Sequence, residues 1–218
     1  MRGSLKIKVD LHVHTCYSYD GLITAKDLLF YAKKNGLDSV AVTDHNRIDG
    51  ALKLSKEKNF PIIPGIEISS KNGHIIGLNV QEPVPKNLSV EETIDKIHEL
   101  GGLAIACHPR ALFKSSLKLK VSQKFDAVEV INASAFPFKY SVKQARKLAC
   151  SLNLVQVAGS DAHYGPEIGL AFTLVEADPE SEDIVKAVGK GLCQPFGRAV
   201  PLKIRLKREI LAFKTRIN

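Results

Sequence analysis

The sequence lacks the features of membrane and exported proteins. None of its apolar runs approaches the roughly 20 residues of a membrane span, and its N-terminus has no apolar signal-peptide core. Internal repeats, low-complexity stretches and linkers are missing too. A composition of 44% hydrophobic and 25% charged residues does not fit a disordered chain. We therefore expect one cytoplasmic domain over residues 1–218, with no membrane partner.

Cysteine is scarce and scattered along the chain. The four cysteines form no C-x-x-C pair of the kind that marks a zinc ribbon or a redox site. We interpret them as free, buried thiols. Two of them adjoin histidine motifs, but their spacing does not require metal binding, so we leave them out of the candidate site. The four are Cys16, Cys107, Cys150 and Cys193.

Short apolar segments alternate with amphipathic ones along most of the chain. The apolar segments predict seven strands and, less regularly, an eighth. Strands that alternate with helices in one domain are typical of a parallel, barrel-like α/β fold. The expected strand ranges are 7–12, 39–43, 62–67, 74–79, 103–106, 127–131 and 155–158, with the further one at 172–175.

Helix boundaries are also visible in the sequence. Two pairs with the spacing of a capping box, one of them the aspartate variant, predict helix starts, and an Asp-Pro pair predicts a third N-cap and first turn. Two glycines are placed to end helices. These residues are Thr24 with Asp27, Ser89 with Glu92, Asp178 with Pro179, and the glycines Gly36 and Gly101.

Histidines and acids gather at the predicted strands. In "DLHVHT", residues two apart on a strand point to one face, so His12 and His14 project together. Similar residues occur in "TDH", "GIEIS", "CHP" and "GSDAH", and six of the seven histidines lie on or beside strands. His98, inside a predicted helix, is interpreted as a solvated or packing residue. The remaining residues of this set are Asp44, His45, Glu67, His74, His108, Asp161 and His163.

Ordinary strand-end histidines and a metal centre are the two explanations for this distribution. In an α/β barrel the carboxyl ends of the strands face one mouth, so side chains that are distant in sequence converge there. Histidines that are simply buried in the core with their hydrogen bonds made would not gather at strand ends. Imidazoles with carboxylates suit zinc, manganese or iron, and their number exceeds what one four-coordinate ion needs. We therefore predict more than one metal ion, although His74 begins its strand and fits this scheme least.

The motifs "DLHVHT", "TDH", "GIEIS", "CHP" and "GSDAH", in this order, resemble those of the PHP (polymerase and histidinol phosphatase) superfamily of metal-dependent phosphoesterases. The resemblance covers nearly the whole chain. It implies an α/β fold, a distorted (β/α)7 barrel similar to a TIM barrel, with two or three divalent ions of manganese, zinc or iron. It also implies nine metal ligands: His12, His14, Asp20, His45, Glu67, His74, His108, Asp161 and His163.

One ligand position departs from part of the family. Some members have the acidic ligand that follows the H-x-H pair one residue earlier, at the position that Tyr19 occupies in this chain. Here the early acid is Asp20. Two further acids, Asp10 and Asp44, adjoin ligands. Both could orient imidazoles, and both could equally cap strand ends.

The expected chemistry is hydrolysis of a phosphate ester. Divalent ions held together lower the pKa of a shared water, so hydroxide is available near neutral pH, and they clamp the phosphoryl oxygens during in-line displacement. A histidine at the mouth could protonate the leaving group, but the sequence does not identify it. The residues that we expect to be catalytic are His12, His14, Glu67, His108, Asp161 and His163.

Arginines near the ligands are candidates for substrate binding, because a guanidinium binds phosphate through two hydrogen bonds. Arg47 and Arg110 each follow a ligand histidine by two residues, and Arg198 lies in a glycine-arginine stretch like one found in family members. Each could instead be a solvated surface residue. Glu129 and Asn132 either face the mouth or have a structural role at a strand end.

The segment 201–218 is basic, with six lysines and arginines against one glutamate in a chain of formal net charge +8. Four apolar residues recur in it at helical spacing. We expect a helix that packs its apolar stripe on the barrel and turns its basic face outward. Such a face is usually solvated, but it could attract nucleic acid. The apolar residues are Leu206, Ile210, Phe213 and Ile217.

Three classes of function remain open. The first is a phosphatase or phosphodiesterase acting on a small phosphorylated metabolite or nucleotide, with a nuclease such as an exonuclease on RNA or DNA as its alternative. The second is a non-catalytic, RNA-associated PHP-like subunit, which would be expected to have lost ligands. The third is a hydrolase of carbon-nitrogen bonds, which would usually place a metal-bridging lysine at a strand end, and no lysine here fits that position. Oligomeric state is left open.

Overall fold

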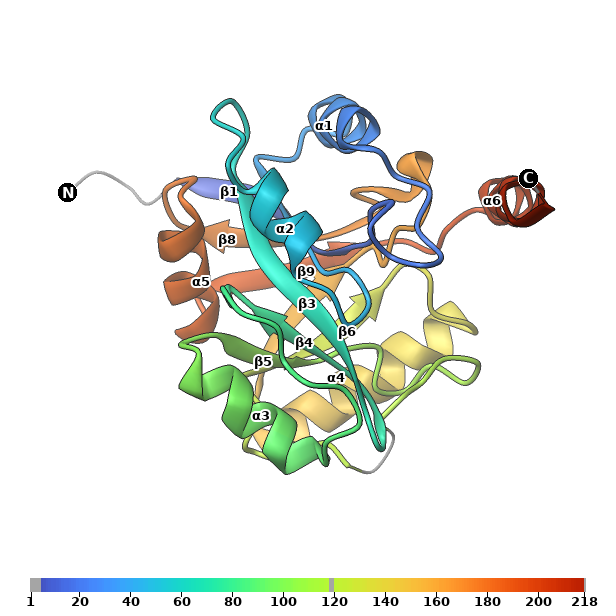
Figure 1. The fold of residues 1–218 in the computed structure, drawn as a ribbon. Coiled ribbons are helices and arrows are strands. Elements are labelled where there is room, and N and C mark those ends of the chain that lie inside the picture. The colour runs from blue at the N-terminus through green and yellow to red at the C-terminus, as the bar shows by residue number, and fades with distance from the viewer. Residues whose placement is uncertain (1–4, 118–119, 218) are drawn as a thin grey trace.

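The computed structural model describes residues 5–117 and 120–217, and its main element is one nine-stranded sheet (Figure 1). The strands lie in the order β7-β6-β5-β4-β3-β2-β1-β8-β9. All eight strand segments expected from the sequence are present, β5 with the expected bounds and the other seven with shifted ends, and β9 is an addition. The strands are β1 Lys6–Val13, β2 Ser39–Val42, β3 Ile62–Ser70, β4 Gly73–Leu78, β5 Leu103–Ala106, β6 Ala127–Asn132, β7 Val155–Gly159, β8 Ala171–Glu176 and β9 Cys193–Gly197.

The sheet is mixed, which corrects the expectation of a parallel barrel. Strands β1, β2 and β3 are parallel to one another, as are β5, β6 and β7. In contrast, β4 is antiparallel to both of its neighbours, and β8 is antiparallel to β1 and β9. The reason is local, because β3 and β4 are joined by a short turn, whereas a parallel pair needs a crossover of a dozen or more residues.

The sheet curls into a nearly closed barrel. Its two ends approach each other, with β7 contacting β1, β8 and β9. An isolated parallel bridge joins Val13 at the end of β1 to Ala162 just beyond β7. The amide of His14 donates to the carbonyl of Ala162, and the amide of Asp161 donates to the carbonyl of His12. These bonds bring the last residues of β1 and β7 together at one end of the barrel.

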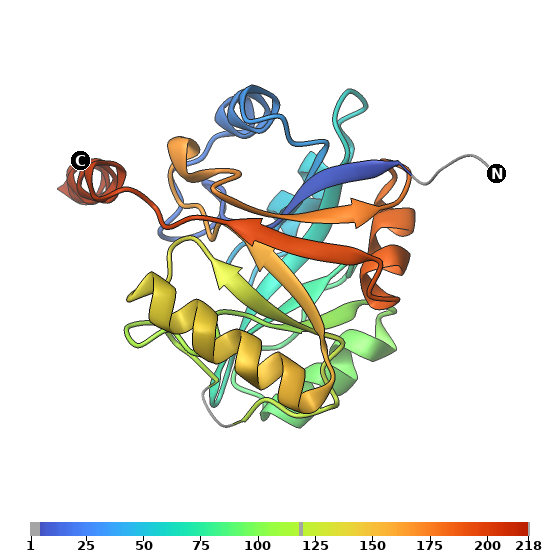
Figure 2. The same ribbon diagram turned by 180° about the vertical axis from the view of Figure 1, so that it is seen from behind.

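Helices cover the outside of the barrel (Figures 1 and 2). Both capping boxes are present, at Thr24 and Ser89. The glycines that follow these two helices have φ of +66° at Gly36 and +75° at Gly101, the left-handed conformation of a helix end. The helices are α1 Ala25–Lys34, α2 Asp49–Leu54, α3 Val90–Glu99, α4 Phe138–Leu152, α5 Ser181–Gly189 and α6 Leu202–Ile217, with a 3₁₀ turn at Gly165–Glu167.

The expected start of α5 is wrong by two residues. The helix is N-capped by Glu180, whose carbonyl accepts from the amide of Ile184, instead of by Asp178. The backbone carbonyl of Asp178 accepts from the amide of Glu180 at 2.8 Å, so the Asp-Pro pair forms a tight turn before the helix. An Asp-Pro pair favours turns as well as N-caps, which is why the sequence pattern misplaces this boundary.

The core divides into two apolar clusters. One takes buried residues from each of β1 to β8, such as Ile63, Ile76 and Val157, together with Ile184 and Val188 of α5. The other lies between the strands and α1, α3 and α4. Because both are filled by side chains, the polar residues at the strand ends lie beyond the packed core.

The apolar stripe of the C-terminal helix is exposed, whereas we expected it to pack on the barrel. Residues 202–217 are helical, but Leu206, Ile210 and Phe213 are between 56% and 67% exposed. The side chain of Ile217 lies outside the description. In both views α6 stands at the edge of the molecule (Figures 1 and 2). Its inward face carries Ile204, which packs against the core, and Arg205.

The exposure of this stripe predicts that it contributes little to stability. Leu206→Ala should change the free energy of unfolding by less than about 0.5 kcal/mol, as for other surface positions. The same substitution at the fully buried Leu28 of α1 should cost about 2–5 kcal/mol. Urea unfolding of the two variants checks this. Equal losses would show that the outer face of α6 is covered.

Candidate metal centre

The structure brings together the histidines and acids that the sequence places far apart. His12 and His14 come from β1 and the residue after it, His45 from the loop after β2, Glu67 from β3 and His108 from the loop after β5. Asp161 and His163 follow β7, His74 lies at the start of β4, and Asp20 lies in the loop after β1. His74 reaches the cluster because β4 is antiparallel, so its first residues lie beside the carboxyl end of β3. Ser69 pairs with His74 there.

Glu67 occupies the centre of this cluster, and its side chain is about 1% exposed. Its Oε1 lies 2.9 Å from His74 Nδ1 and 3.0 Å from His108 Nε2. Its Oε2 lies 3.0 Å from His45 Nδ1, 3.2 Å from His14 Nε2 and 3.5 Å from His12 Nε2. One carboxylate therefore touches five imidazoles from four parts of the chain. A carboxylate in this position could take part in holding more than one metal ion.

The H-x-H pair forms a second focus. The Nε2 atoms of His12 and His14 are only 3.1 Å apart, and Asp161 Oδ1 lies 3.6 and 3.5 Å from them. Nδ1 of His12 donates to Glu129 Oε1 at 3.0 Å, which leaves Nε2 as the ring's free nitrogen. Two ring nitrogens and a carboxylate oxygen thus point at one place, as ligands of a shared cation would.

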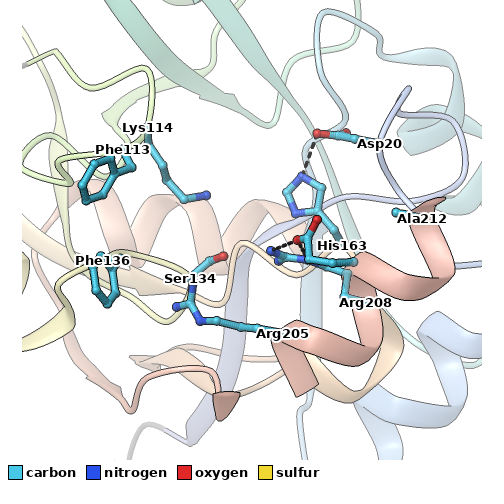
Figure 3. A pocket seen from close by; sticks show the side chains of 10 residues that line it. Asp20, Phe113, Lys114, Ser134, Phe136, His163, Arg205, Arg208 and Ala212 are labelled. Atoms are coloured by element: carbon cyan, nitrogen blue, oxygen red, sulfur yellow. Dashed lines mark hydrogen bonds and ion pairs between the residues drawn. The ribbon is translucent and has the colours of Figure 1, made fainter. Parts of the chain in front are cut away.

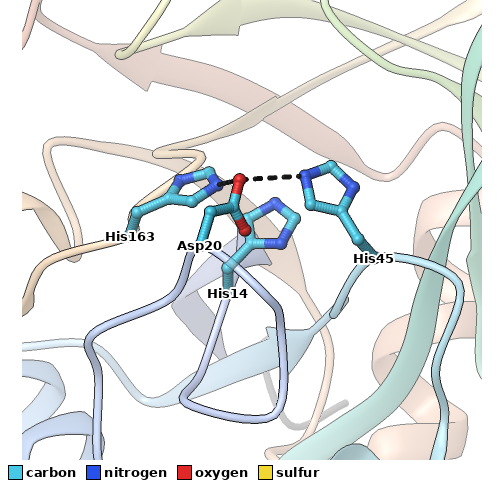
Figure 4. A group of neighbouring side chains, drawn as sticks. All are labelled: His14, Asp20, His45 and His163. Atoms are coloured by element: carbon cyan, nitrogen blue, oxygen red, sulfur yellow. Dashed lines mark ion pairs between the residues drawn. The ribbon is translucent and has the colours of Figure 1, made fainter. Parts of the chain in front are cut away.

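Asp20, His14, His45 and His163 form a third group (Figure 4). Asp20 Oδ2 lies 3.2 Å from His163 Nε2 and 3.5 Å from His45 Nε2. Tyr19 instead is 80% exposed and its ring stacks on that of His45, with centroids 5.2 Å apart. Of the two candidate positions for the early acid, Asp20 is the one that reaches the cluster.

These donors fit divalent metal ions. Four sets of three or four side chains offer ligand atoms that all lie within 4.8 Å of one another. Two buried ring nitrogens of the cluster have no hydrogen-bond partner among the described residues: His14 Nδ1 and His108 Nδ1. A buried polar atom without a partner is costly. The sets, which offer imidazole and carboxylate donors and, in the last, the thiol of Cys107, are His14-Asp20-His45-His163, His12-His14-Asp161, His45-Glu67-His74 and Glu67-Cys107-His108.

Mutual charge compensation dominates the electrostatics of the cluster. Burial alone would raise the pKa of Glu67, but His12 and hydrogen bonds from His108 outweigh it and hold the pKa well below its usual range. Burial would lower the pKa of His14, but hydrogen bonds to Asp161 and Glu67 raise it to about 9. Strong perturbations at one buried cluster are typical of functional sites.

The neighbouring acids divide into two roles. Glu129 orients ligands, because its Oε1 accepts from His12 Nδ1 and its Oε2 accepts from the amide of His108 at 2.7 Å. Asp10 instead accepts from the amides of His12, Ser160 and Gly169. Asp44 and Asn132 fix the loops: Asp44 accepts from the amide and hydroxyl of Thr15, and Asn132 Nδ2 donates to Glu129 and Asp161. Asp10 and Asp44 thus hold backbone and loop groups, as strand-end caps do.

Two of the candidate ligands lie on backbone with positive φ. His108 has φ of +33° and Asp161 has φ of +54°. Residues other than glycine adopt this region rarely, and such positions cluster at functional sites. The surrounding bonds to the amides of His108 and Asp161 hold these conformations in place.

The thiols differ from the expectation of buried cysteines. All four are free, but Cys16 and Cys150 are exposed and Cys193 is half-buried. Only Cys107 is fully buried, and its thiol donates to Glu67 Oε1 at 3.3 Å. Burial and the charge of Glu67 raise the pKa of this thiol well above its usual value. Cys107 therefore adjoins the cluster as a neutral donor.

The structure brings a lysine into the site that the sequence analysis missed. Lys114, from the loop after β5, forms an ion pair with Asp161 and lines the cleft over the metal ligands. It does not lie at a strand end, and only its position six residues after His108 hints at the site.

A larger cavity of about 350 Å³ adjoins this cleft (Figure 3). Four residues line both: Asp20, Phe113, Lys114 and His163. The far wall is formed by α6, through Arg205 and Arg208. Their spacing of three places both on one helix face, a signal present in the sequence. The basic side of α6 is therefore partly turned inward, in contrast to our expectation.

The three arginines proposed from the sequence are placed differently. Arg47 is exposed and its guanidinium binds Asp49, with Nη2 to Oδ2 at 2.8 Å. Arg198 is exposed beyond β9 and lines neither the cleft nor the larger cavity. Arg110 borders a small cavity with His108 and Glu129. Among these three, only Arg110 approaches a ligand residue, and its role in substrate binding stays a prediction.

The chain belongs to the PHP domain family, whose domain matches residues 10–187. It is 43% identical over 141 residues to an uncharacterised protein of Methanocaldococcus jannaschii, covering 58% of this chain and 82% of that protein. A Proteus mirabilis protein named "Probable phosphatase" is 26% identical over 183 residues, covering 77% and 70%. A 5'-3' exoribonuclease of Haemophilus influenzae is 32% identical over 99 residues, covering 42% and 36%.

Solved structures confirm the fold. A two-domain Bacteroides vulgatus protein, described as containing a predicted PHP-like metal-dependent phosphoesterase, superposes with a TM-score of 0.73 at 17% identity. The match covers 91% of this chain, which spans 66% of that longer one. The architecture is thus the nearly closed mixed α/β barrel of the PHP type. Among residues 5–117 and 120–217, no helix is long and apolar enough to cross a membrane.

The geometry predicts that Glu67 controls binding of more than one ion. We expect two or three divalent ions per chain in protein purified without chelator and remetallated. Glu67→Ala should remove more than one of them, because its oxygens reach five imidazoles. Elemental analysis measures this.

His98→Ala is the matched control for metal content. His98 bonds Asp126 at 2.8 Å, away from the cluster. A native content below two ions, or equal loss in both variants, would contradict the shared role of Glu67.

Proposed function

We propose that the protein is a metal-dependent phosphoesterase that hydrolyses the phosphate ester of a small metabolite or nucleotide. The observation that carries this proposal is the convergence of all nine expected ligands, Glu67 and eight others, beside an open cavity that offers cations. Membership of the PHP family and the similarity to a protein named as a phosphatase support it.

Different side chains would have different roles in this reaction. Divalent ions held by these side chains would supply Lewis acidity and would lower the pKa of a water molecule. Glu129 and Asn132 fix the orientation of His12 and Asp161. Lys114 and Arg205 offer positive charge to the phosphate and to the rest of the substrate. His163, at the border of cleft and cavity, would join His14, Asp20 and His45 in holding an ion.

The competing functions differ in what supports them. A nuclease is the second candidate, because the cavity lies next to the ligands and an exoribonuclease is among the relatives. A non-catalytic subunit is disfavoured by the complete ligand set. For a carbon-nitrogen hydrolase, Lys114 does reach Asp161, but from a loop instead of a strand end.

Loss of single ligands should abolish hydrolysis without unfolding the barrel. We expect His12→Ala, His45→Ala and Asp161→Ala to lower kcat/KM for the best phosphate ester at least about a hundredfold, because each removes a contact made at the reacting centre. The assay screens phosphorylated metabolites, nucleotides and short oligonucleotides with manganese-loaded protein. Circular dichroism confirms folding.

His98→Ala is the control for activity and should stay near the native rate. If no phosphate ester in the panel is cleaved by the native, metal-loaded protein, the proposal fails. If oligonucleotides are cleaved much faster than any small ester, the nuclease candidate replaces it.

A further inference from the structure

The metal centre lies beside a helix that the family match does not include. The PHP domain match ends at residue 187, whereas α6 begins at Leu202. Arg208 of α6 lines the same cavity as His163, which follows β7 (Figure 3). His163 belongs to the candidate ligand group around Asp20. A residue outside the matched domain is thus a neighbour of a candidate metal ligand.

Glu167 connects Arg208 to His163. Its side chain is fully buried in the 3₁₀ turn Gly165–Glu167. Its Oε2 accepts from the amides of His163 and Tyr164 at 2.9 and 3.2 Å. Its Oε1 accepts from Nη1 of Arg208 at 3.1 Å. One oxygen therefore holds the backbone of a candidate ligand, and the other holds α6.

Arg208 supplies the positive charge that this buried carboxylate needs. No other lysine, arginine or histidine among residues 5–117 and 120–217 lies within ion-pair distance of Glu167. Loss of one member of a buried ion pair leaves the other charge uncompensated, which is strongly unfavourable. The guanidinium also donates through Nε and Nη2 to the exposed Glu209. Without Arg208, Glu167 would lose the partner that keeps it beside the two amides.

The ring of His163 is oriented through its backbone. Its amide donates to Glu167, and its carbonyl accepts from the amide of Leu22 at 2.8 Å. Its Nδ1 donates to the carbonyl of Asp161 at 3.0 Å, which leaves Nε2 facing Asp20 Oδ2 at 3.2 Å. A turn of this backbone would move Nε2 away from the other donors of the group (Figure 4).

From these contacts we propose that Arg208 is a positioning residue of the metal centre. Through Glu167 it fixes the backbone that carries His163, and it thereby strengthens binding of the ion held by the group around Asp20. The set of Glu67, Cys107 and His108 shares no residue with that group, so its ion should not depend on Arg208. The inference rests on the metal centre of the proposed phosphoesterase, but it concerns the binding of an ion and not the choice of ester.

Binding of manganese at controlled free concentrations tests the proposal. Native protein and variants are dialysed against chelator buffers that set the free manganese concentration, and the ions bound per chain are measured by elemental analysis. Arg208→Gln and Glu167→Gln should each shift the half-saturation of one ion to at least about tenfold higher free manganese, as expected when a group that orients a metal ligand is lost. Another ion should bind as in the native protein.

Two further variants separate positioning from a general structural role. Because Arg208 acts through Glu167, the double variant Arg208→Gln/Glu167→Gln should bind the ion no more weakly than the weaker of the two single variants. Arg208→Lys keeps a cation opposite Glu167 and should restore most of the native affinity. Losses that add in the double variant would refute a shared path.

Three controls leave this path intact. Lys207→Gln removes a charge from the exposed side of α6, and Glu209→Gln removes the exposed partner of Arg208. Ile184→Ala opens a cavity in the core at α5, so it lowers the stability of the fold and keeps every hydrogen bond of Glu167. All three should bind manganese as the native protein does. If any of them matches Arg208→Gln, or if Arg208→Gln binds like the native protein, the positioning role is refuted.

Metal binding and hydrolysis are measured separately, so this proposal and the phosphoesterase function can fail independently. A difference between Arg208→Gln and Lys207→Gln in a protein that cleaves no ester would retain the positioning role and reject the enzyme. Hydrolysis by the native protein without that difference would do the reverse. Circular dichroism verifies that each variant is folded. If Arg208→Gln does not fold, the comparison of Glu167→Gln with Glu209→Gln decides the same question.

Discussion

The buried carboxylate of Glu67 is the constraint on which the rest of the mouth depends. Five imidazoles approach its two oxygens within 3.5 Å, and they come from β1, the loop after β2, β4 and the loop after β5. A charge removed from water is tolerated only with partners close by. The barrel supplies those partners by ending its strands at one place. The bridge between the ends of β1 and β7 adds Asp161 and His163 to the same cluster.

The sequence predicts well which side chains meet at the mouth, because candidate metal ligands are of particular residue types. Imidazoles and carboxylates at strand ends are few, and their order along the chain is distinctive. It predicts strand direction poorly. The β3-β4 turn makes β4 antiparallel, and this one feature explains why His74, a misfit in a parallel barrel, lies beside Glu67. A strand pattern indicates which residues alternate, but pairing direction depends on connections and tertiary contacts.

The lining of the cavity next to the metal centre, in contrast, is poorly predicted by the sequence. Lys114, Phe113 and Arg205 are residue types that usually lie on any protein surface, and they come from a loop and a terminal helix. No spacing rule marks Lys114 or Phe113, and the spacing of Arg205 and Arg208 places both on one helix face without showing where that face turns. The sequence did indicate an amphipathic helix, but not which face turns inward. Backbone acceptors at Ala133 and Val200, and the buried Glu167, favour the face with the arginines.

This orientation of α6 connects the wall of the cavity to the metal centre through a short series of hydrogen bonds and ion pairs. Glu167 accepts from Arg208 on one side and from the amides of His163 and Tyr164 on the other. Asp20 joins His163 to the cluster around Glu67 by way of His45. The wall of the cavity and the ligands of the metal centre are thus parts of one hydrogen-bonded assembly, and the geometry of each limits that of the other.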